Sequence, residues 1–231
     1  MRTRKLLIFF FILPTLFFFS NEVQGQSKFG IKASGGLSRI INSMKSENAA
    51  LNTQFAPSGQ AGLFFTFQFE KKSMLSAEFL LSQIEGKEIL ETKNDENIWF
   101  QQLDNGYFKN MNYRHITYLS LPIYYGLRFN RLTINAGFQG SYTFSSSGRS
   151  KSEATLNGTT YTSDEKMDNI NIKKIDLGPR AGIIYQFIEK LAIEGTYYYG
   201  FNNIQKGDAP IWKLKVQQIT FGIRYTLGKE E

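Results

Sequence analysis

Apolar and polar residues alternate with a period of two over most of this chain. The clearest run extends from Leu132 to Phe144, where large or apolar residues occupy every second position and small or polar residues lie between them. Such alternation predicts a β-strand with one apolar and one polar face. The run is longer than an average strand of a soluble protein.

The same alternation recurs in other segments, and none of them shows a helical period. The predicted strands cover residues 29–39, 59–69, 75–82, 119–129, 132–144, 175–187, 191–201 and 219–228. The chain is therefore predicted to be all-β.

Short and long connections alternate between these strands. The tight turns are 70–73, 129–131 and 188–190, and the long polar connections are 41–57, 87–112, 145–172 and 202–213. This order predicts an eight-stranded antiparallel transmembrane β-barrel with short periplasmic turns and long extracellular loops. Weak alternation at 87–92 leaves open a continuation of the third strand or an extra hairpin, so ten strands remain an alternative.

The polar face indicates which side of the strands meets lipid. It is rich in glycine: Gly30, Gly36, Gly62, Gly126, Gly137, Gly178, Gly182, Gly200 and Gly222. Glycine weakens a solvent-facing strand, but inside a narrow barrel it relieves crowding and permits curvature. Aromatic residues at segment ends fit the girdles of a membrane barrel: Tyr142, Phe144, Tyr197, Tyr199 and Phe201. We therefore expect the apolar face to point outward.

This orientation places charged residues inside the barrel. The predicted lumen-facing set is Lys32, Glu78, Arg128, Asp176, Arg180, Glu194 and Arg224. Buried charges must pair or stay hydrated, because an unpaired one costs several kcal/mol. The favoured interpretation is a salt-bridged plug, since about eight strands leave an interior that side chains fill. A path for small solutes or ions, lined by the arginines, is the alternative.

The N-terminal segment predicts export. Arg2, Arg4 and Lys5 precede an uncharged, largely apolar run at 6–19, and a short polar stretch follows that ends with the small residue Gly25. This is the order of a secretory signal peptide, and the run is shorter than a spanning helix needs. We predict a cut after Gly25, with the barrel domain at 26–231.

The composition limits the kinds of metal and catalytic site that the chain can form. The sequence has no cysteine and one histidine, His115, so disulfides, thiolate sites and paired-histidine zinc motifs are excluded. No metal and no cofactor is predicted. The formal net charge is +7, but like charges form no long run. An exported chain rarely meets nucleic acid, and none is predicted as a partner.

Several segments resemble a known family. The run YLSLPIYYGLRFN at 118–130 is similar to the Tyr-Leu-Glu-Ile-Pro strand of the PorT-like outer-membrane β-barrel proteins of Bacteroidetes, although Ser120 stands where that family commonly has Glu. INAGFQGSY at 134–142, DLGPRAGIIYQF at 176–187 and IEGTYYYGFNNI at 193–204 resemble its later strands. The resemblance implies an outer-membrane barrel and, through the member PorT, a link to type IX protein secretion.

The last predicted strand carries a second resemblance. Thr220, Gly222, Tyr225 and Leu227 have the spacing of a polar-x-Gly-x-x-aromatic-x-hydrophobic pattern similar to a barrel-assembly signal. A strand with an apolar edge is suited to pair with the insertion machinery by strand addition.

We expect a non-enzymatic scaffold or interaction protein, linked to protein secretion or envelope maintenance. The expected partners are outer-membrane lipid, the barrel-assembly machinery and secretion-system or envelope proteins. Binding is most plausible on the long connections, where the candidate contacts are Trp99, Phe100, Tyr107 and Phe108. Packing of these aromatics onto the barrel rim is an equal alternative.

Two other functions remain open. A lipid-modifying hydrolase would need a base beside a nucleophile, and His115 with Ser120 or Thr117 is the candidate pair. However, His115 shares its strand face with the lipid-facing Leu119, which favours a histidine at the rim. A soluble periplasmic barrel that binds an apolar ligand is the third hypothesis.

Overall fold

The computed structural model describes seven stretches of the chain. They are residues 26–42, 50–69, 72–93, 107–156, 158–168, 170–206 and 213–227. The predicted signal peptide at 1–25 lies outside the described residues and stays a prediction.

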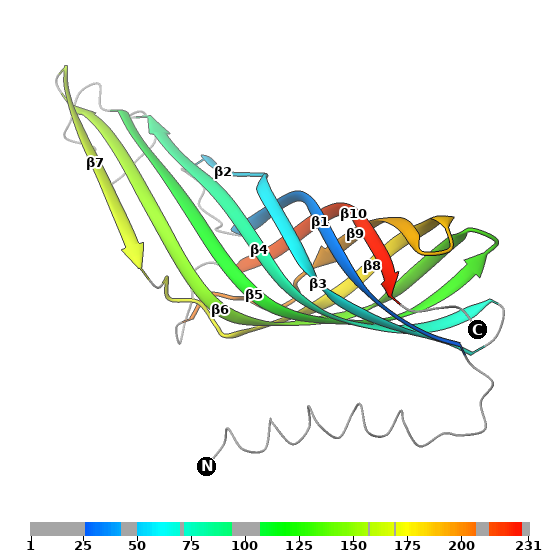
Figure 1. Ribbon diagram of the computed structural model, residues 1–231. Helices are drawn as coiled ribbons and strands as arrows, with labels where there is room; N and C mark the ends of the chain where they lie inside the picture. The colour runs from blue at the N-terminus through cyan, green and yellow to red at the C-terminus, as the bar shows by residue number, and fades with distance from the viewer. Residues whose placement is uncertain are drawn as a thin grey trace, which may run out of the picture.

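The described chain is built from β-strands (Figure 1). They are β1 (Gln26–Asn42), β2 (Ala50–Gln54), β3 (Ala56–Gln68), β4 (Ser73–Lys93), β5 (Tyr107–Phe129), β6 (Leu132–Leu156), β7 (Thr159–Asp168), β8 (Ile175–Ile188), β9 (Leu191–Tyr199) and β10 (Leu214–Leu227). Within the described stretches, no helix has the length and apolar character needed to cross a bilayer.

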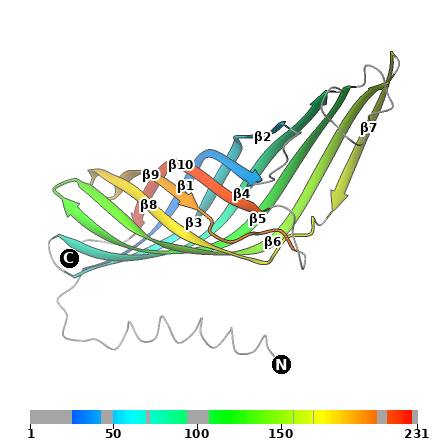
Figure 2. The ribbon, with the colours of Figure 1, turned by 180° about the vertical axis from the view of Figure 1, so that it is seen from behind.

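Eight of these strands form a closed antiparallel ring, which both ribbon views show (Figures 1 and 2). The ring order is β1, β3, β4, β5, β6, β8, β9 and β10, and β10 pairs again with β1. The closing register runs from Phe29 opposite Leu227 to Asn42 opposite Leu214. The predicted eight-stranded barrel is confirmed. Its closure leaves the ring itself with no unpaired edge, as lipid requires.

The barrel wall has an apolar outer face and a polar inner face. Phe138 and Phe221 are 66% and 69% exposed on the outside, whereas Glu78 and Asp176 are 2% and 0% exposed inside. This distribution confirms the predicted orientation of the two faces. It also disfavours a soluble barrel, because the exposed apolar surface of a monomer in water is rarely so extensive.

Exposed aromatic residues gather at both ends of the wall. Phe69, Phe129 and Phe187 lie beside the short turns, and Tyr142 and Phe201 lie toward the opposite end. These positions match the two aromatic girdles of a membrane barrel. The short turns mark the periplasmic end of the wall, and the longer connections mark the extracellular end.

The described parts of the long connections at 41–57, 87–112 and 145–172 are mostly strand, where the sequence predicted loop. β4, β5 and β6 continue beyond the ring, β2 pairs with β4, and β7 pairs with β6 (Figure 1). The weak alternation at 87–92 does continue the strand that becomes β4. Above the membrane both faces of a strand meet water, so the ladder persists while the apolar period that reveals a strand is lost. We call this part the extracellular sheet: residues 50–54, 87–93, 107–116, 145–156 and 159–168.

We predict that Gly178→Ala destabilises the barrel. Gly178 faces inward on β8, and an added Cβ would overlap the backbone carbonyl oxygen of Tyr199. Such overpacking costs roughly 1–3 kcal/mol. The loss is measured as a lower urea midpoint in lipid vesicles.

The matched control is Gly35→Ala. Gly35 faces outward, and the nearest atom to its added Cβ is the carbonyl oxygen of Ser58 at 4.0 Å. This variant should unfold at the wild-type urea concentration. Equal midpoints for the two alanine variants would contradict the close approach at Gly178.

Candidate functional site

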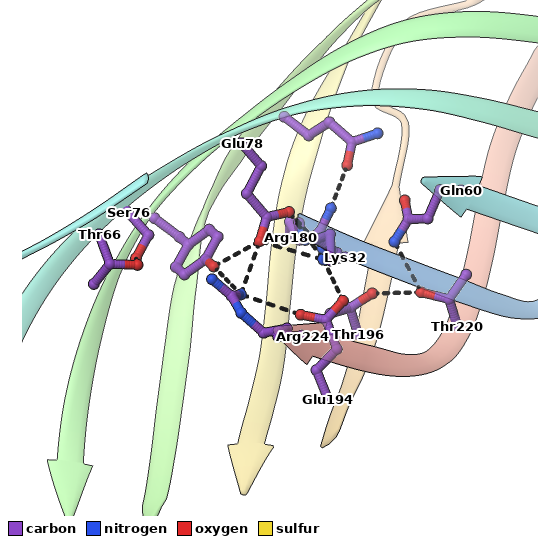
Figure 3. Close-up of polar contacts among 12 residues, drawn as sticks. Lys32, Gln60, Thr66, Ser76, Glu78, Arg180, Glu194, Thr196, Thr220 and Arg224 are labelled. Carbon is purple, nitrogen blue, oxygen red and sulfur yellow. Dashed lines mark hydrogen bonds and ion pairs between the residues drawn. The ribbon is translucent and has the colours of Figure 1, made fainter. Parts of the chain in front are cut away.

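A layer of charged side chains crosses the middle of the barrel (Figure 3). The charged layer consists of Lys32, Glu78, Arg180, Glu194 and Arg224, which come from β1, β4, β8, β9 and β10. All five residues are buried. Closure of the ring brings these residues together although they are far apart in the sequence, with Glu78 of β4 reaching the others across the lumen.

Glu78 is the centre of this layer. Its carboxylate lies 3.1 Å from Lys32 Nζ, 3.2 Å from Arg180 Nη2 and 2.9 Å from Arg224 Nη1. Glu194 forms ion pairs with Lys32 and, at 3.1 Å, with Arg224 Nη1. The two carboxylates therefore share the three cations.

Uncharged side chains complete the layer. Tyr124 Oη donates a hydrogen bond to Glu78 Oε1 at 2.7 Å and accepts one from Arg224 Nη1 at 2.6 Å. Arg180 Nη1 donates to Gln139 Oε1 at 3.0 Å. The Arg224 guanidinium also lies 4.0 Å from the centre of the Phe64 ring. Strand parity places Tyr124 and Gln139 on the inner face, but it could not reveal their partners, which belong to other strands.

Glycines lie opposite three of the charged side chains, at points where strands approach each other closely. Lys32 lies opposite Gly62 of β3, Arg180 lies opposite Gly137 of β6, and Glu194 lies opposite Gly222 of β10. A side chain on each of these glycines would overlap the backbone of an adjacent strand. Glycine and charge thus occur as cross-strand pairs, which accounts for both features of the polar face.

The other two predicted lumen residues lie outside the charged layer. Asp176 lies nearer the extracellular end, where it accepts a hydrogen bond from Tyr198 Oη at 2.8 Å. Arg128 lies at the periplasmic end and donates to Gln186 Oε1 at 3.0 Å and to the Asn130 carbonyl at 2.9 Å. The seven predicted charges therefore do not form a single network.

Toward the extracellular end the lumen becomes apolar. The apolar layer consists of Ile40, Ile84, Ile116, Tyr118, Tyr198, Ile204, Leu214 and Val216. These residues share the inner face with polar residues further down the same strands. The polar inner face predicted from the sequence therefore does not extend along the whole lumen. The charged and apolar layers together fill the lumen at two levels.

A hollow of about 80 Å3 opens at the periplasmic end. Arg224 forms part of its lining, and Lys28, Lys72, Arg128 and Lys190 also line it. Glu189 is the one acidic side chain among the described residues around the hollow. This end of the barrel is therefore basic.

The candidate hydrolase residues His115 and Ser120 point to opposite faces of β5. Ser120 points into the lumen, where its hydroxyl lies 3.0 Å from that of Ser141. His115 faces outward, and its Nδ1 lies 3.3 Å from Glu85 Oε1. Successive strand residues point to opposite faces, so Ser120 cannot serve as a nucleophile for His115. Thr117 does share the outer face with His115. No cluster of His, Cys, Asp or Glu suited to a metal occurs in the described stretches.

The remaining candidate residues fall in two places. Trp99 and Phe100 lie outside the described residues, whereas Tyr107 and Phe108 begin β5 at the end of the extracellular sheet. Their role as partner contacts stays a prediction.

The assembly-signal-like residues of β10 divide between its two faces. Thr220 is buried and accepts a hydrogen bond from Gln60 Nε2 at 3.1 Å, while Tyr225 and Leu227 face outward. Gly222 lies opposite Ser34 of β1. Recognition by the assembly machinery stays a prediction.

Comparison with known families defines the class of protein. Residues 19–206 match the family described as "Outer membrane protein beta-barrel domain". The chain belongs to this family and is an outer-membrane β-barrel protein. Membership of the narrower PorT-like group stays a prediction. No curated protein matches the sequence.

Solved structures of small barrels resemble the chain in fold. Ail, the attachment invasion locus protein of Yersinia pestis, is 14% identical, with 87% of this chain and 99% of that chain covered and a TM-score of 0.39. Neisserial surface protein A is 10% identical over 87% and 99%, with a TM-score of 0.38. OprG from Pseudomonas aeruginosa is 11% identical over 89% and 96%, with a TM-score of 0.37.

We predict that Glu78→Gln strongly destabilises the barrel. The change leaves three buried cations with one carboxylate, and breaking a buried ion pair typically costs about 3–5 kcal/mol. Urea unfolding in lipid vesicles, followed by tryptophan fluorescence, measures the loss.

Glu91→Gln is the control for this experiment. It breaks an exposed ion pair with Lys109, which lies 2.7 Å away on the extracellular sheet. Exposed pairs contribute little to stability, so the urea midpoint should stay at the wild-type value. If Glu78→Gln also kept the wild-type midpoint, the charged layer would not hold the barrel together.

Proposed function

We propose that this protein is a non-conducting, non-enzymatic outer-membrane scaffold whose extracellular sheet binds protein partners. One observation carries the proposal: the lumen is filled by the charged and apolar layers, whereas β4, β5 and β6 extend far beyond the ring. A filled lumen offers no route for a solute. The extracellular sheet is then the part of the described chain best placed to bind a partner.

The extracellular sheet is held in shape by its own contacts. Cross-strand ion pairs join Arg114 to Glu88 at 2.6 Å and Arg149 to Asp164 at 2.5 Å. The hydrogen bond from Arg149 lowers the pKa of the Asp164 carboxyl below its usual value, which favours the charged form of the pair. An isolated hairpin is only marginally stable in water, but here β4, β5 and β6 continue from the barrel, and β2 and β7 pair with β4 and β6. The sheet therefore presents a pre-organised surface, which reduces the entropy cost of binding.

The faces of the sheet suit binding better than its edge. Tyr161 of β7 is 60% exposed, and Tyr113 and Phe108 of β5 are partly exposed. Exposed tyrosines supply large contact area together with a polar group. The edge strand β7 carries Glu165 and Lys166, and charged edges discourage the addition of another strand. We infer that a partner lies against the face of the sheet.

We predict no stable channel activity. The purified protein should produce no lasting openings in planar bilayers, because the buried layers leave no water-filled path. A porin added afterwards to the same bilayer is the positive control. Large, stable openings from the protein alone would contradict the filled lumen and the scaffold role with it.

We predict that partners contact the extracellular sheet. A photo-cross-linking amino acid at Tyr161 should yield defined protein adducts in native cells. The same amino acid at Arg131, in an exposed periplasmic turn, is the matched control and should not yield those adducts.

The identity of the cross-linked proteins tests whether the scaffold serves protein secretion or envelope maintenance. Secretion-system components at Tyr161, with loss of secreted cargo in a deletion strain, would support the role implied by PorT. Envelope proteins would support envelope maintenance. Adducts at Arg131 alone would contradict binding through the extracellular sheet.

A further inference from the structure

A row of polar residues borders the outer apolar band where β1, β10 and β9 meet. Arg39 lies opposite Gln217, and Gln217 lies opposite Tyr199, so the three form one row across these strands. Their side chains share the outward face with Leu37 and Ile219, which lie one row nearer the membrane centre and are exposed. The row is therefore the first polar level above the apolar band, at the height of the outer-leaflet headgroups.

Two cations at this level are held in place by aromatic rings. Arg39 Nε donates to Gln217 Oε1 at 2.6 Å, and the guanidinium carbon lies 4.8 Å from the centre of the Phe55 ring. Lys215 Nζ donates to Tyr199 Oη at 3.4 Å and lies 5.4 Å from the centre of the Tyr199 ring. Contacts of this kind orient long side chains before a ligand arrives and leave their other N–H groups available.

Carboxylates are missing from this part of the outer face. The outward positions of β1, β3, β9 and β10 include no Asp or Glu among the described residues. On the extracellular sheet, by contrast, Lys109 pairs with Glu91, and Asp164 pairs with both Arg149 and Lys151. Arg39 in the row and Lys215, two residues from Gln217 on β10, thus carry positive charge that no described carboxylate on this part of the outer face neutralises.

We propose that Arg39 and Lys215 bind a phosphate group of an anionic lipid in the outer leaflet. The planar guanidinium can donate two parallel hydrogen bonds to phosphate oxygens, and the ammonium adds a second charge from the adjacent strand. Basic residues at the membrane surface attract anionic headgroups, and the apolar band directly below would contact the acyl chains. Tyr199 and Gln217 act as positioning residues for the two cations. This site does not depend on the proposed scaffold role.

Retention of a defined lipid by the full-length mature protein tests the site. The probes are purified phosphorylated lipid A and the same lipid with its phosphates removed, each added to the protein in detergent and followed by native mass spectrometry. We expect wild-type protein to retain the phosphorylated lipid. The double variant Arg39→Gln/Lys215→Gln should bind it at least tenfold more weakly, because it loses both charge-assisted contacts to the phosphate.

A matched double variant separates this site from general surface charge. Lys109→Gln/Lys151→Gln removes two exposed cations from the extracellular sheet and should leave lipid retention unchanged. Equal losses in the two double variants would overturn the proposal, as would equal retention of the dephosphorylated lipid. Displacement of the lipid by inorganic phosphate at the same concentration would also overturn it, because phosphate alone would then be the ligand.

A second measurement does not require the cation variant to fold. A photo-reactive residue at Ile41, which lies opposite Lys215 and is not part of the site, should cross-link to the phosphorylated lipid in otherwise wild-type protein. The same residue at Phe138, on the apolar band of β6, should cross-link equally to lipids with and without phosphate. Absence of any phosphate preference at Ile41 would overturn the site.

Discussion

The pairing of the first strand with the last is the constraint on which the rest of the structure depends. In a bilayer an unpaired backbone N–H or C=O costs several kcal/mol, so a sheet is stable there only when it closes. The β1–β10 ladder, from Phe29 opposite Leu227 to Asn42 opposite Leu214, completes that closure. Once the ring is closed, one face of every strand must meet lipid and the other must fill a narrow interior.

The interior shows how a narrow barrel accommodates long charged side chains. Glycine on one strand lies opposite charge on the next, as with Gly62 and Lys32 or Gly137 and Arg180. An added side chain on Gly62 or Gly137 would overlap the backbone of the strand on its other side, so glycine permits the close approach of strands beside each charged group. The ion pairs centred on Glu78 connect β4 with three other strands, so the charged layer braces the wall from within.

The pattern of side chains along the strands differs between the extracellular half and the membrane half. β4, β5 and β6 continue upward without the apolar period that marks them in the membrane, because water surrounds both of their faces. Ion pairs such as Arg114–Glu88 replace lipid contact as the side-chain interactions of the sheet. The result is an asymmetric molecule, with an extended sheet above one side of the ring (Figure 1).

The sequence by itself determined the strand class, the number of strands in the ring and the direction of the two faces. Alternation such as that of Leu132–Phe144 is a local property, and the glycines of the polar face indicate a crowded interior. Only the tertiary structure decided which inward charges meet. Strand register brings Glu78 to Lys32 and Arg224, while it leaves Arg128 and Asp176 elsewhere. It also revealed the apolar layer and the strands β2 and β7, because these depend on partners distant in the sequence and not on a local period.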